Sequence, residues 1–261
     1  MKLIRGGSDF KMIHSFLLIG QSNMAGRGFM DGVEPINNNK IKVLRNGRWQ
    51  LAYRPINCDR PFSGVCLAES FAEAYVQDHH VDVGLIPCAD GGTSLDQWKE
   101  GSLLYDHAIS QAKLASRTSA IAGVLWHQGE AECEQNRYLT YRERLEKIIK
   151  AMRRELELDD VPFLIGGLGD FLQNFRMEVV AENYKKVNEA LKETARYNEL
   201  VGFVSAEGLT ANPDNLHFNT VSLRELGLRY YQEFRKLENR NKEFVEKQTE
   251  DDTVRGALEL L

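Results

Sequence analysis

The chain alternates short apolar runs with longer segments in which apolar residues recur at helical spacing. Short, almost continuously apolar runs are typical of strands buried on both faces of a parallel sheet. In the helical segment 138–156, Leu145 and Met152 share one face, opposite charged residues. This alternation predicts a three-layer α/β/α sandwich around a five-stranded parallel sheet. The expected strands are residues 13–19, 81–87, 121–126, 162–166 and 201–204, and the expected helices are residues 68–77, 105–116, 138–156, 179–197 and 222–237.

Polar, glycine-containing segments directly follow the first three predicted strands, at residues 20–22, 88–94 and 127–130. The carboxyl ends of parallel strands lie at one edge of the sheet, and ligands of such folds bind outside that edge. The convergence of three such segments is a stronger signal than any one of them. The pattern therefore predicts a single functional site at this edge.

The ends of the chain and one internal segment fall outside the alternation. Residues 31–63 contain a hairpin pattern around Asn46-Gly47 and are expected to form an excursion over the functional edge. We expect a polar leader at residues 1–12, with Met12 as an alternative start, and one domain over residues 13–237. The charged residues 238–261 are expected to form a tail or a helix. They are equally compatible with a solvated end and with a subunit contact, which would make the protein a homo-oligomer.

Composition narrows the class of protein. A chain of 261 residues that is 43% hydrophobic and 27% charged is long enough for one sizeable globular domain. A net charge of −5 argues against a nucleic-acid partner. No apolar run approaches the roughly 18 residues that would span a membrane. The four cysteines show neither a C-x-x-C pair nor metal-type spacing, which favours reduced thiols in a cytoplasmic protein.

Ser22 lies directly after the first predicted strand and is a candidate nucleophile. A serine hydroxyl needs a base to take its proton, and only His127 and His217 of the six histidines fall at the functional edge. His217 is the better base, because the Asp214 carboxylate three residues earlier can accept the imidazole Nδ1–H and leave Nε2 facing the serine. Alone, this D-x-x-H spacing is more often a helix cap. Together with Ser22 and the other edge segments, it favours a catalytic triad.

Acyl transfer also needs donors for the developing oxyanion. Gly91-Gly92 can turn a backbone N–H inward where a side chain would obstruct a substrate. Gln128 offers a side-chain amide, and the backbone N–H of Ser22 is a third donor. Taken alone, Gly91-Gly92 is an ordinary turn and Gln128 is a buried amide that bonds to the backbone.

Four motifs follow one another along the chain: residues 20–26 (GQSNMAG), 89–94 (ADGGTS), 126–130 (WHQGE) and 214–217 (DNLH). In this order they resemble the SGNH hydrolase superfamily, and more closely its branch of sialate O-acetylesterase-like and acetylxylan-esterase-related proteins. The resemblance implies a flavodoxin-like strand order and removal of acetyl groups from carbohydrates. It implies that Ser22 is the nucleophile, His217 the base and Asp214 its orienting acid. It also implies that Gly92 and Gln128 join the Ser22 N–H in the oxyanion hole.

Glu130 leaves the acid of the triad open. Its carboxylate lies at the same edge and could orient His217 in place of Asp214 or alongside it. Alternatively, it is a structural acid that bonds backbone amides or Arg27. We favour Asp214. A metal site could be considered at residues 127–133, from His127, Glu130, Glu132 and Cys133. No pair of histidines elsewhere in the chain supports it, so neither a metal nor another cofactor is expected.

Four polar residues near this edge are candidate substrate-binding residues: Gln21 and Asn23, which flank the nucleophile, Arg60 and His127. Arg60 can donate hydrogen bonds to a sugar, and His127 is expected to line the pocket. Trp98 could stack on a sugar ring, although packing in the core explains it equally well.

The expected activity is hydrolysis of acetyl esters of a small carbohydrate or oligosaccharide through an acetyl-enzyme on Ser22. A polar mouth and the lack of a long apolar lid favour a small acyl group. Two alternatives stay open. One is a lipase or thioesterase of the same superfamily that acts on longer acyl chains, and the other is a carbohydrate-binding protein without catalysis. The α/β-hydrolase elbow G-x-S-x-G is absent, because Met24 stands where its second glycine would be.

Overall fold

The computed structural model describes residues 12–258, and the side chains of residues 12–239. All five predicted strands and all five predicted helices are present, with ends that differ by a few residues except at the C-terminal end of the last helix. The strands are β1 (Ile13–Gly20), β2 (Ile41–Arg45), β3 (Arg48–Leu51), β4 (Val83–Pro87), β5 (Ser119–His127), β6 (Phe163–Gly166) and β7 (Val201–Val204). The α-helices are α1 (Ser22–Ala25), α2 (Ala68–His79), α3 (Leu103–Ala115), α4 (Tyr141–Leu156), α5 (Glu178–Tyr197) and α6 (Thr220–Leu258). The 3₁₀ turns are η1 (Leu95–Gln97), η2 (Glu130–Cys133), η3 (Arg137–Thr140) and η4 (Asp170–Asn174).

The sheet has the order β3-β2-β4-β1-β5-β6-β7, and every neighbouring pair is parallel except β2 with β3. The five predicted strands occupy the order β4-β1-β5-β6-β7 within it. Numbered along the chain, this is the 2-1-3-4-5 order of flavodoxin-like folds. The predicted fold class is confirmed.

The number of strands is a correction, because the sheet has seven strands rather than five. The predicted hairpin around Asn46-Gly47 does form, as β2 and β3. The hairpin itself does not lie over the functional edge, since β2 pairs with β4 and extends the sheet. The pairing buries Ile41 and Val43, which are fully enclosed. Burial of these two side chains is a physical reason for the hairpin to join the sheet. The later part of the predicted excursion does reach that edge, where Asn57 contacts Ala89 just after β4.

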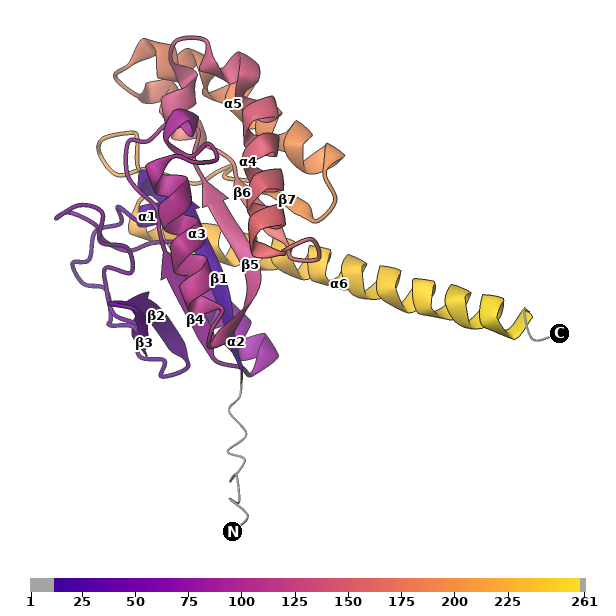
Figure 1. Cartoon of the computed structure of the whole chain (residues 1–261). Coiled ribbons are helices and arrows are strands. Elements are labelled where there is room, and N and C mark those ends of the chain that lie inside the picture. Colours follow the sequence, from indigo (N-terminus) through magenta and orange to yellow (C-terminus); the bar gives the residue numbers. More distant parts are fainter. Residues whose placement is uncertain (1–11, 259–261) are drawn as a thin grey trace.

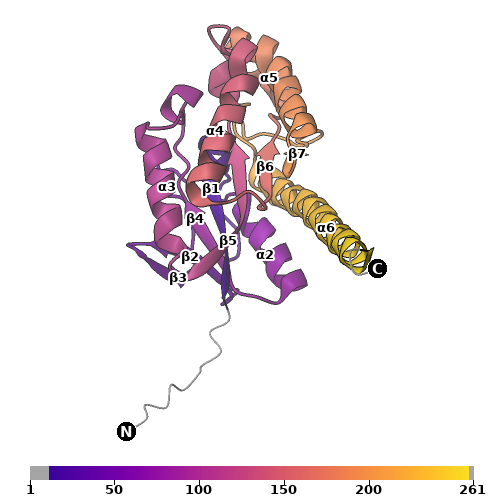
Figure 2. The same cartoon turned by 45° about the vertical axis from the view of Figure 1, so that its right-hand side comes forward.

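Helices cover both faces of the sheet (Figures 1 and 2). α3, α4 and α5 lie on one face, and α2 and α6 lie on the other. The second layer is held by an aromatic cluster in which Phe16 of β1 meets Phe71 and Tyr75 of α2 edge-to-face, with ring centroids 4.8 Å apart in both pairs. Phe234 of α6 joins the cluster. Each face of the sheet is therefore buried under its own helical layer.

α6 is longer than the sequence pattern predicted, since it continues from Thr220 to Leu258. Figure 1 shows its C-terminal part projecting away from the rest of the molecule. The predicted leader lies outside the described residues apart from Met12, so the division into leader, domain and tail stays a prediction. Among the described residues, no helix combines the length and apolar character that a membrane span requires.

Candidate active site

Ser22 is positioned by a sharp turn between β1 and α1. Gly20 ends the strand with φ +126°, and a Cβ at this residue would lie 2.2 Å from the carbonyl oxygen of His127. Only glycine fits such a backbone and such a close approach. α1 begins at Ser22, so the serine stands at the carboxyl end of β1 as the sequence predicted.

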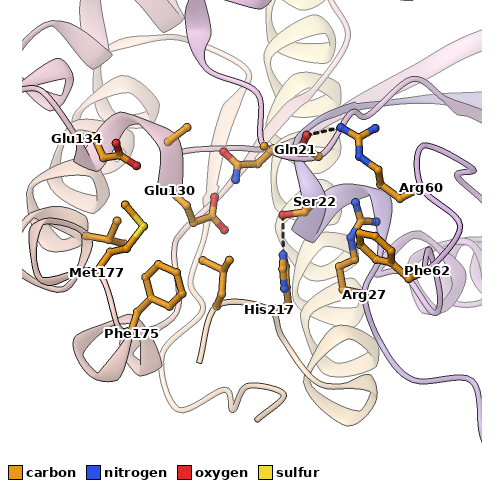
Figure 3. Close-up of a pocket in the computed structure, with 15 residues that line it drawn as sticks. Gln21, Ser22, Arg27, Arg60, Phe62, Glu130, Glu134, Phe175, Met177 and His217 are labelled. Carbon is orange, nitrogen blue, oxygen red and sulfur yellow. Dashed lines mark hydrogen bonds between the residues drawn. The ribbon is translucent and has the colours of Figure 1, made fainter. Parts of the chain in front are cut away.

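His217 and Asp214 lie beside Ser22 (Figure 3). His217 Nε2 is 3.0 Å from Ser22 Oγ, and its Nδ1 is 2.7 Å from Asp214 Oδ2. The other carboxylate oxygen, Asp214 Oδ1, accepts the backbone N–H groups of Leu216 and His217. Burial alone would raise the pKa of Asp214, but these hydrogen bonds outweigh it and hold the pKa below its usual value. The carboxylate thus stays ionised opposite Nδ1, which is the arrangement that a general-base histidine requires.

Asn23 holds the loop that carries His217 in place and does not line the pocket. It is 1% exposed. Its amide nitrogen donates to Leu216 O at 3.2 Å and to Glu130 Oε1 at 2.5 Å, and its Oδ1 accepts the N–H of Phe218 at 3.1 Å. The predicted role of Asn23 in binding substrate is therefore corrected, because its polar atoms are engaged with residues on both sides of His217.

Glu130 lines the pocket, but it does not contact His217 through a hydrogen bond. Its Oε1 accepts the Asn23 amide, and its buried Oε2 has no hydrogen-bond partner among the described residues. Burial raises the pKa of the Glu130 carboxyl above its usual value. Of the two acids left open by the sequence, Asp214 is the one that the structure places on the imidazole.

Two backbone N–H groups are available for an oxyanion. Ser22 and Gly92 both line the pocket, and neither backbone N–H has a hydrogen-bond acceptor within the described part of the chain. Gly92 adopts φ +78°, a conformation that favours glycine. The neighbouring Gly91 also leaves no room for a side chain, since a Cβ there would lie 2.5 Å from Arg27 Nη2. The structure brings Gly92 and Ser22 together as predicted.

Gln128 is placed differently from the prediction. Its side chain is completely buried, and its amide nitrogen donates to Thr93 O at 3.2 Å and lies 3.5 Å from Glu132 Oε1. Gln128 is not among the residues that line the pocket. This placement corrects the expectation of a third oxyanion donor. The amide instead supports residues 89–94, which we call the glycine loop, from behind.

His127 is also a correction, because it does not line the pocket. It is fully buried below the site, where its Nδ1 is 3.1 Å from the Tyr230 hydroxyl and its ring meets Phe218 edge-to-face. Burial lowers the pKa of His127 from 6.5 to about 3. His127 is thus a neutral core residue. Elsewhere too, the described histidines, cysteines and acids form no group of three that could hold a metal ion.

The burial of His127 predicts an acid-dependent loss of stability. Below about pH 6.5 the unfolded chain protonates this histidine while the folded protein does not, because its folded pKa is about 3. The free energy of unfolding should then fall as the pH falls, by up to about 1.4 kcal/mol per pH unit. We expect His127→Gln to remove this part of the slope in urea unfolding measured between about pH 6 and pH 4.5. The exposed His107→Gln should leave the slope unchanged, and an unchanged slope in His127→Gln would contradict this placement.

Residues 57–60, in the predicted excursion, hold the glycine loop through its backbone. Asp59 Oδ2 accepts the Gly91 N–H at 2.9 Å and pairs with Arg27 Nη2 at 2.6 Å. Asn57 donates to Ala89 O at 2.9 Å. Burial alone would raise the pKa of Asp59, but hydrogen bonds from Arg27 and other donors hold it below its usual value. We call residues 57–60 the clamp. The sequence pattern suggested residues 57–60 as sugar contacts and Arg27 as a partner of Glu130, but the pairing of Arg27 with Asp59 was not predicted.

Arg60 belongs to the clamp and also lines the pocket, as predicted. It donates to Gly91 O at 2.9 Å and pairs with Asp90 Oδ1 at 3.0 Å. Gln21 lines the pocket as well, and its Oε1 accepts the Gly129 N–H at 3.3 Å. Trp98 is fully buried and bonds to Thr93 Oγ1, so packing in the core accounts for it.

Removing the negative charge of Asp59 is expected to slow catalysis without weakening substrate binding. Asp59→Asn deprives the Gly91 N–H of a charged acceptor, so the next N–H, that of Gly92, should lose its fixed position. We expect kcat for acetyl ester hydrolysis to fall by about 10- to 100-fold with little change in KM. Asp31→Asn, an exposed acid of the same excursion, is the matched control. Wild-type kcat in a folded Asp59→Asn protein would show that the clamp does not position the donor.

The pocket at Ser22 has a volume of about 370 Å³. Figure 3 shows Arg27, Arg60 and Phe62 on one side of the Ser22–His217 pair, and Glu130, Glu134, Phe175 and Met177 on the other. A cavity of this size, lined by apolar surfaces and a few polar groups, is typical of a small-molecule site.

Comparison with known proteins agrees with this architecture. A family model described as carbohydrate esterase, sialic acid-specific acetylesterase matches residues 12–236. A probable carbohydrate esterase of Arabidopsis thaliana is 30% identical over 239 residues, which cover 82% of this chain and 86% of that protein. A solved structure of an Arabidopsis thaliana protein superposes with a TM-score of 0.76 at 29% identity, covering 86% of this chain and 98% of the other. The crystal structure of NanS superposes with a TM-score of 0.70 at 16% identity, covering 88% and 98% of the two chains, and shows the fold alone.

Proposed function

Because the chain belongs to the carbohydrate esterase family described as sialic acid-specific acetylesterases, and so acts on carboxylic ester bonds, we propose that it removes acetyl groups from a carbohydrate through an acetyl-enzyme on Ser22. The observation that carries the proposal is the continuous series of contacts from Asp214 through His217 to Ser22, at 2.7 and 3.0 Å. These side chains come from two distant parts of the chain and meet beside two unpaired backbone donors.

The geometry supports the following reaction. Ser22 Oγ attacks the ester carbonyl carbon while its proton passes to His217 Nε2. The carbonyl oxygen becomes an oxyanion, which the N–H groups of Ser22 and Gly92 stabilise. When the intermediate collapses, the bond to the sugar oxygen breaks and that oxygen takes the proton from His217. Water then attacks the acetyl-enzyme with His217 again as the base, which releases acetate and restores the serine.

The pocket favours a short acyl group joined to a polar alcohol. A volume of about 370 Å³ accommodates an acetyl group with one sugar ring, but leaves little space for a long acyl chain in addition. Polar groups stand on both sides of Ser22 and suit the hydroxyl groups of a sugar. The apolar surfaces of Phe62 and Phe175 suit the faces of its ring.

Release of acetate from a panel of esters tests this proposal. We expect the protein to release acetate from at least one member of a panel of acetylated xylo-oligosaccharides, acetylated sialic acid and simple acetylated sugars. Activity should fall steadily as the acyl group of p-nitrophenyl esters lengthens from acetyl to octanoyl. No release from any sugar, with faster cleavage of long acyl chains, would favour a lipase or thioesterase. Failure to hydrolyse any ester, together with no labelling by a fluorophosphonate, would favour a carbohydrate-binding protein without catalysis.

A further inference from the structure

Both arginines that line the pocket are already engaged by carboxylates. Arg27 holds Asp59 through two nitrogens, with Nη1 3.1 Å from Oδ1 and Nη2 2.6 Å from Oδ2. The two side chains are only 5% and 2% exposed. Arg60 pairs with Asp90 at 3.0 Å and also donates to the carbonyl oxygen of Gly91. Each positive charge at the pocket is therefore balanced by a negative charge within the clamp or the glycine loop.

The opposite wall carries two acids that make no ion pair within the described part of the chain. Glu130 and Glu134 line this wall beside Phe175 and Met177 (Figure 3). Across residues 12–239, the side chain of Glu134 has no ion pair and no hydrogen bond. Asp214 does not add to this wall, because its carboxylate is held against His217 Nδ1. Burial raises the pKa of Glu130, which favours its neutral form, so Glu134 is the lining acid whose negative charge no described side chain balances.

From this distribution of charge we infer that the pocket selects uncharged carbohydrate esters and discriminates against a sugar that carries a carboxylate. The inference rests on the proposed function and narrows its substrate class. A carboxylate in the pocket would meet an unpaired Glu134, and the described cations that line the pocket, Arg27 and Arg60, are both engaged. A neutral sugar can instead donate its hydroxyl hydrogens to the acids. The family description names an acidic sugar, so this chain would differ from that description.

A substrate carboxylate could bind Arg60 only by replacing Asp90. The exchange trades one carboxylate for another at a guanidinium that is 39% exposed, so little interaction energy is gained. It would also leave Asp90 without its cation and disturb the Arg60 hydrogen bond to Gly91 O. Because Gly91 precedes the oxyanion donor Gly92, binding in this way should impair the reaction that follows.

Three sugar acetates that differ at one position test the inference. They are an acetylated methyl glucoside, the matching glucuronoside with a free carboxylate, and the methyl ester of that glucuronoside. The third compound has the bulk of the acid without its charge. We expect kcat/KM to be similar for the glucoside and the methyl ester, and roughly tenfold or more lower for the carboxylate. The difference should shrink when salt is raised, because added salt screens the repulsion.

Two charge-removing variants locate the effect. Glu134→Gln removes the unpaired acid, and Asp90→Asn removes the partner of Arg60. Each should raise the ratio of kcat/KM for the carboxylate over that for its methyl ester by roughly threefold to tenfold. Asp159→Asn makes the same change in charge on the loop before β6, at the opposite edge of the sheet, and should leave the ratio unchanged.

The outcomes separate the inference from the function on which it rests. Equal kcat/KM for the carboxylate and its methyl ester in the wild-type protein would overturn the inference alone. So would a preference for the carboxylate, or a ratio that neither Glu134→Gln nor Asp90→Asn changes. If the wild-type protein releases no acetate from any of the three sugars, the proposed function is overturned and the inference with it.

Discussion

Replacing Ser22 with alanine is expected to lower kcat for acetyl ester hydrolysis by about 10⁵-fold, while KM changes little. The hydroxyl oxygen of Ser22 is 3.0 Å from His217 Nε2, and Ser22 is 6% exposed at the base of the pocket. The substitution removes the atom that attacks the ester but keeps the backbone N–H groups of Ser22 and Gly92. Acetate release and p-nitrophenyl acetate hydrolysis measure the effect.

The matched control for this variant is Ser205→Ala, which changes an exposed serine just after β7. It should keep wild-type activity with both substrates. The same assays should be repeated with protein that has been shown to fold by its thermal unfolding curve. Undiminished turnover in a folded Ser22→Ala protein would contradict the proposed nucleophile.

The second large effect is expected at Asp214. Asp214→Asn keeps the size of the side chain, but an amide cannot hold the imidazole Nδ1–H at 2.7 Å as a carboxylate does. We expect kcat to fall by about 10³-fold. Glu130→Gln should cost at least tenfold less, because the structure shows Glu130 bonded to Asn23 and not to His217.

The comparison of these two variants decides which acid assists the histidine. kcat with p-nitrophenyl acetate is the appropriate quantity, since this substrate has no sugar for Glu130 to contact. A larger loss in Glu130→Gln than in Asp214→Asn would reverse the assignment. Equal losses would mean that both carboxylates act on His217.

The sequence predicted the core of the fold because that core follows from local patterns. Each of these elements is buried in the core, and its sequence shows this as an apolar run or an apolar face whichever elements happen to cover it. The examples are the runs at β1, β5 and β7 and the apolar face of α4. The position of the hairpin was wrong because a hairpin pattern fixes the pairing of β2 with β3, but not the pairing of β2 with β4. That contact joins residues about 40 positions apart and depends on which edge of the sheet is free.

The same distinction applies to the site. Ser22, His217 and Asp214 could be predicted because the chemistry of a nucleophile requires a base and an acid of particular types. His127 and Gln128 were misplaced because a polar residue after a strand can turn toward the pocket or into the core. The structure buries both completely.

Trapping the acetyl-enzyme tests the central claim most directly. Wild-type protein mixed with an acetylated sugar, quenched in acid within the first turnover and digested, should yield a peptide containing Ser22 that carries one acetyl group. The acetyl group should be absent from the Ser22→Ala protein and should accumulate on Ser22 when hydrolysis of the intermediate is slowed. Acetate release without an acetylated Ser22 peptide under those conditions, or an acetyl group on another residue, would contradict the account.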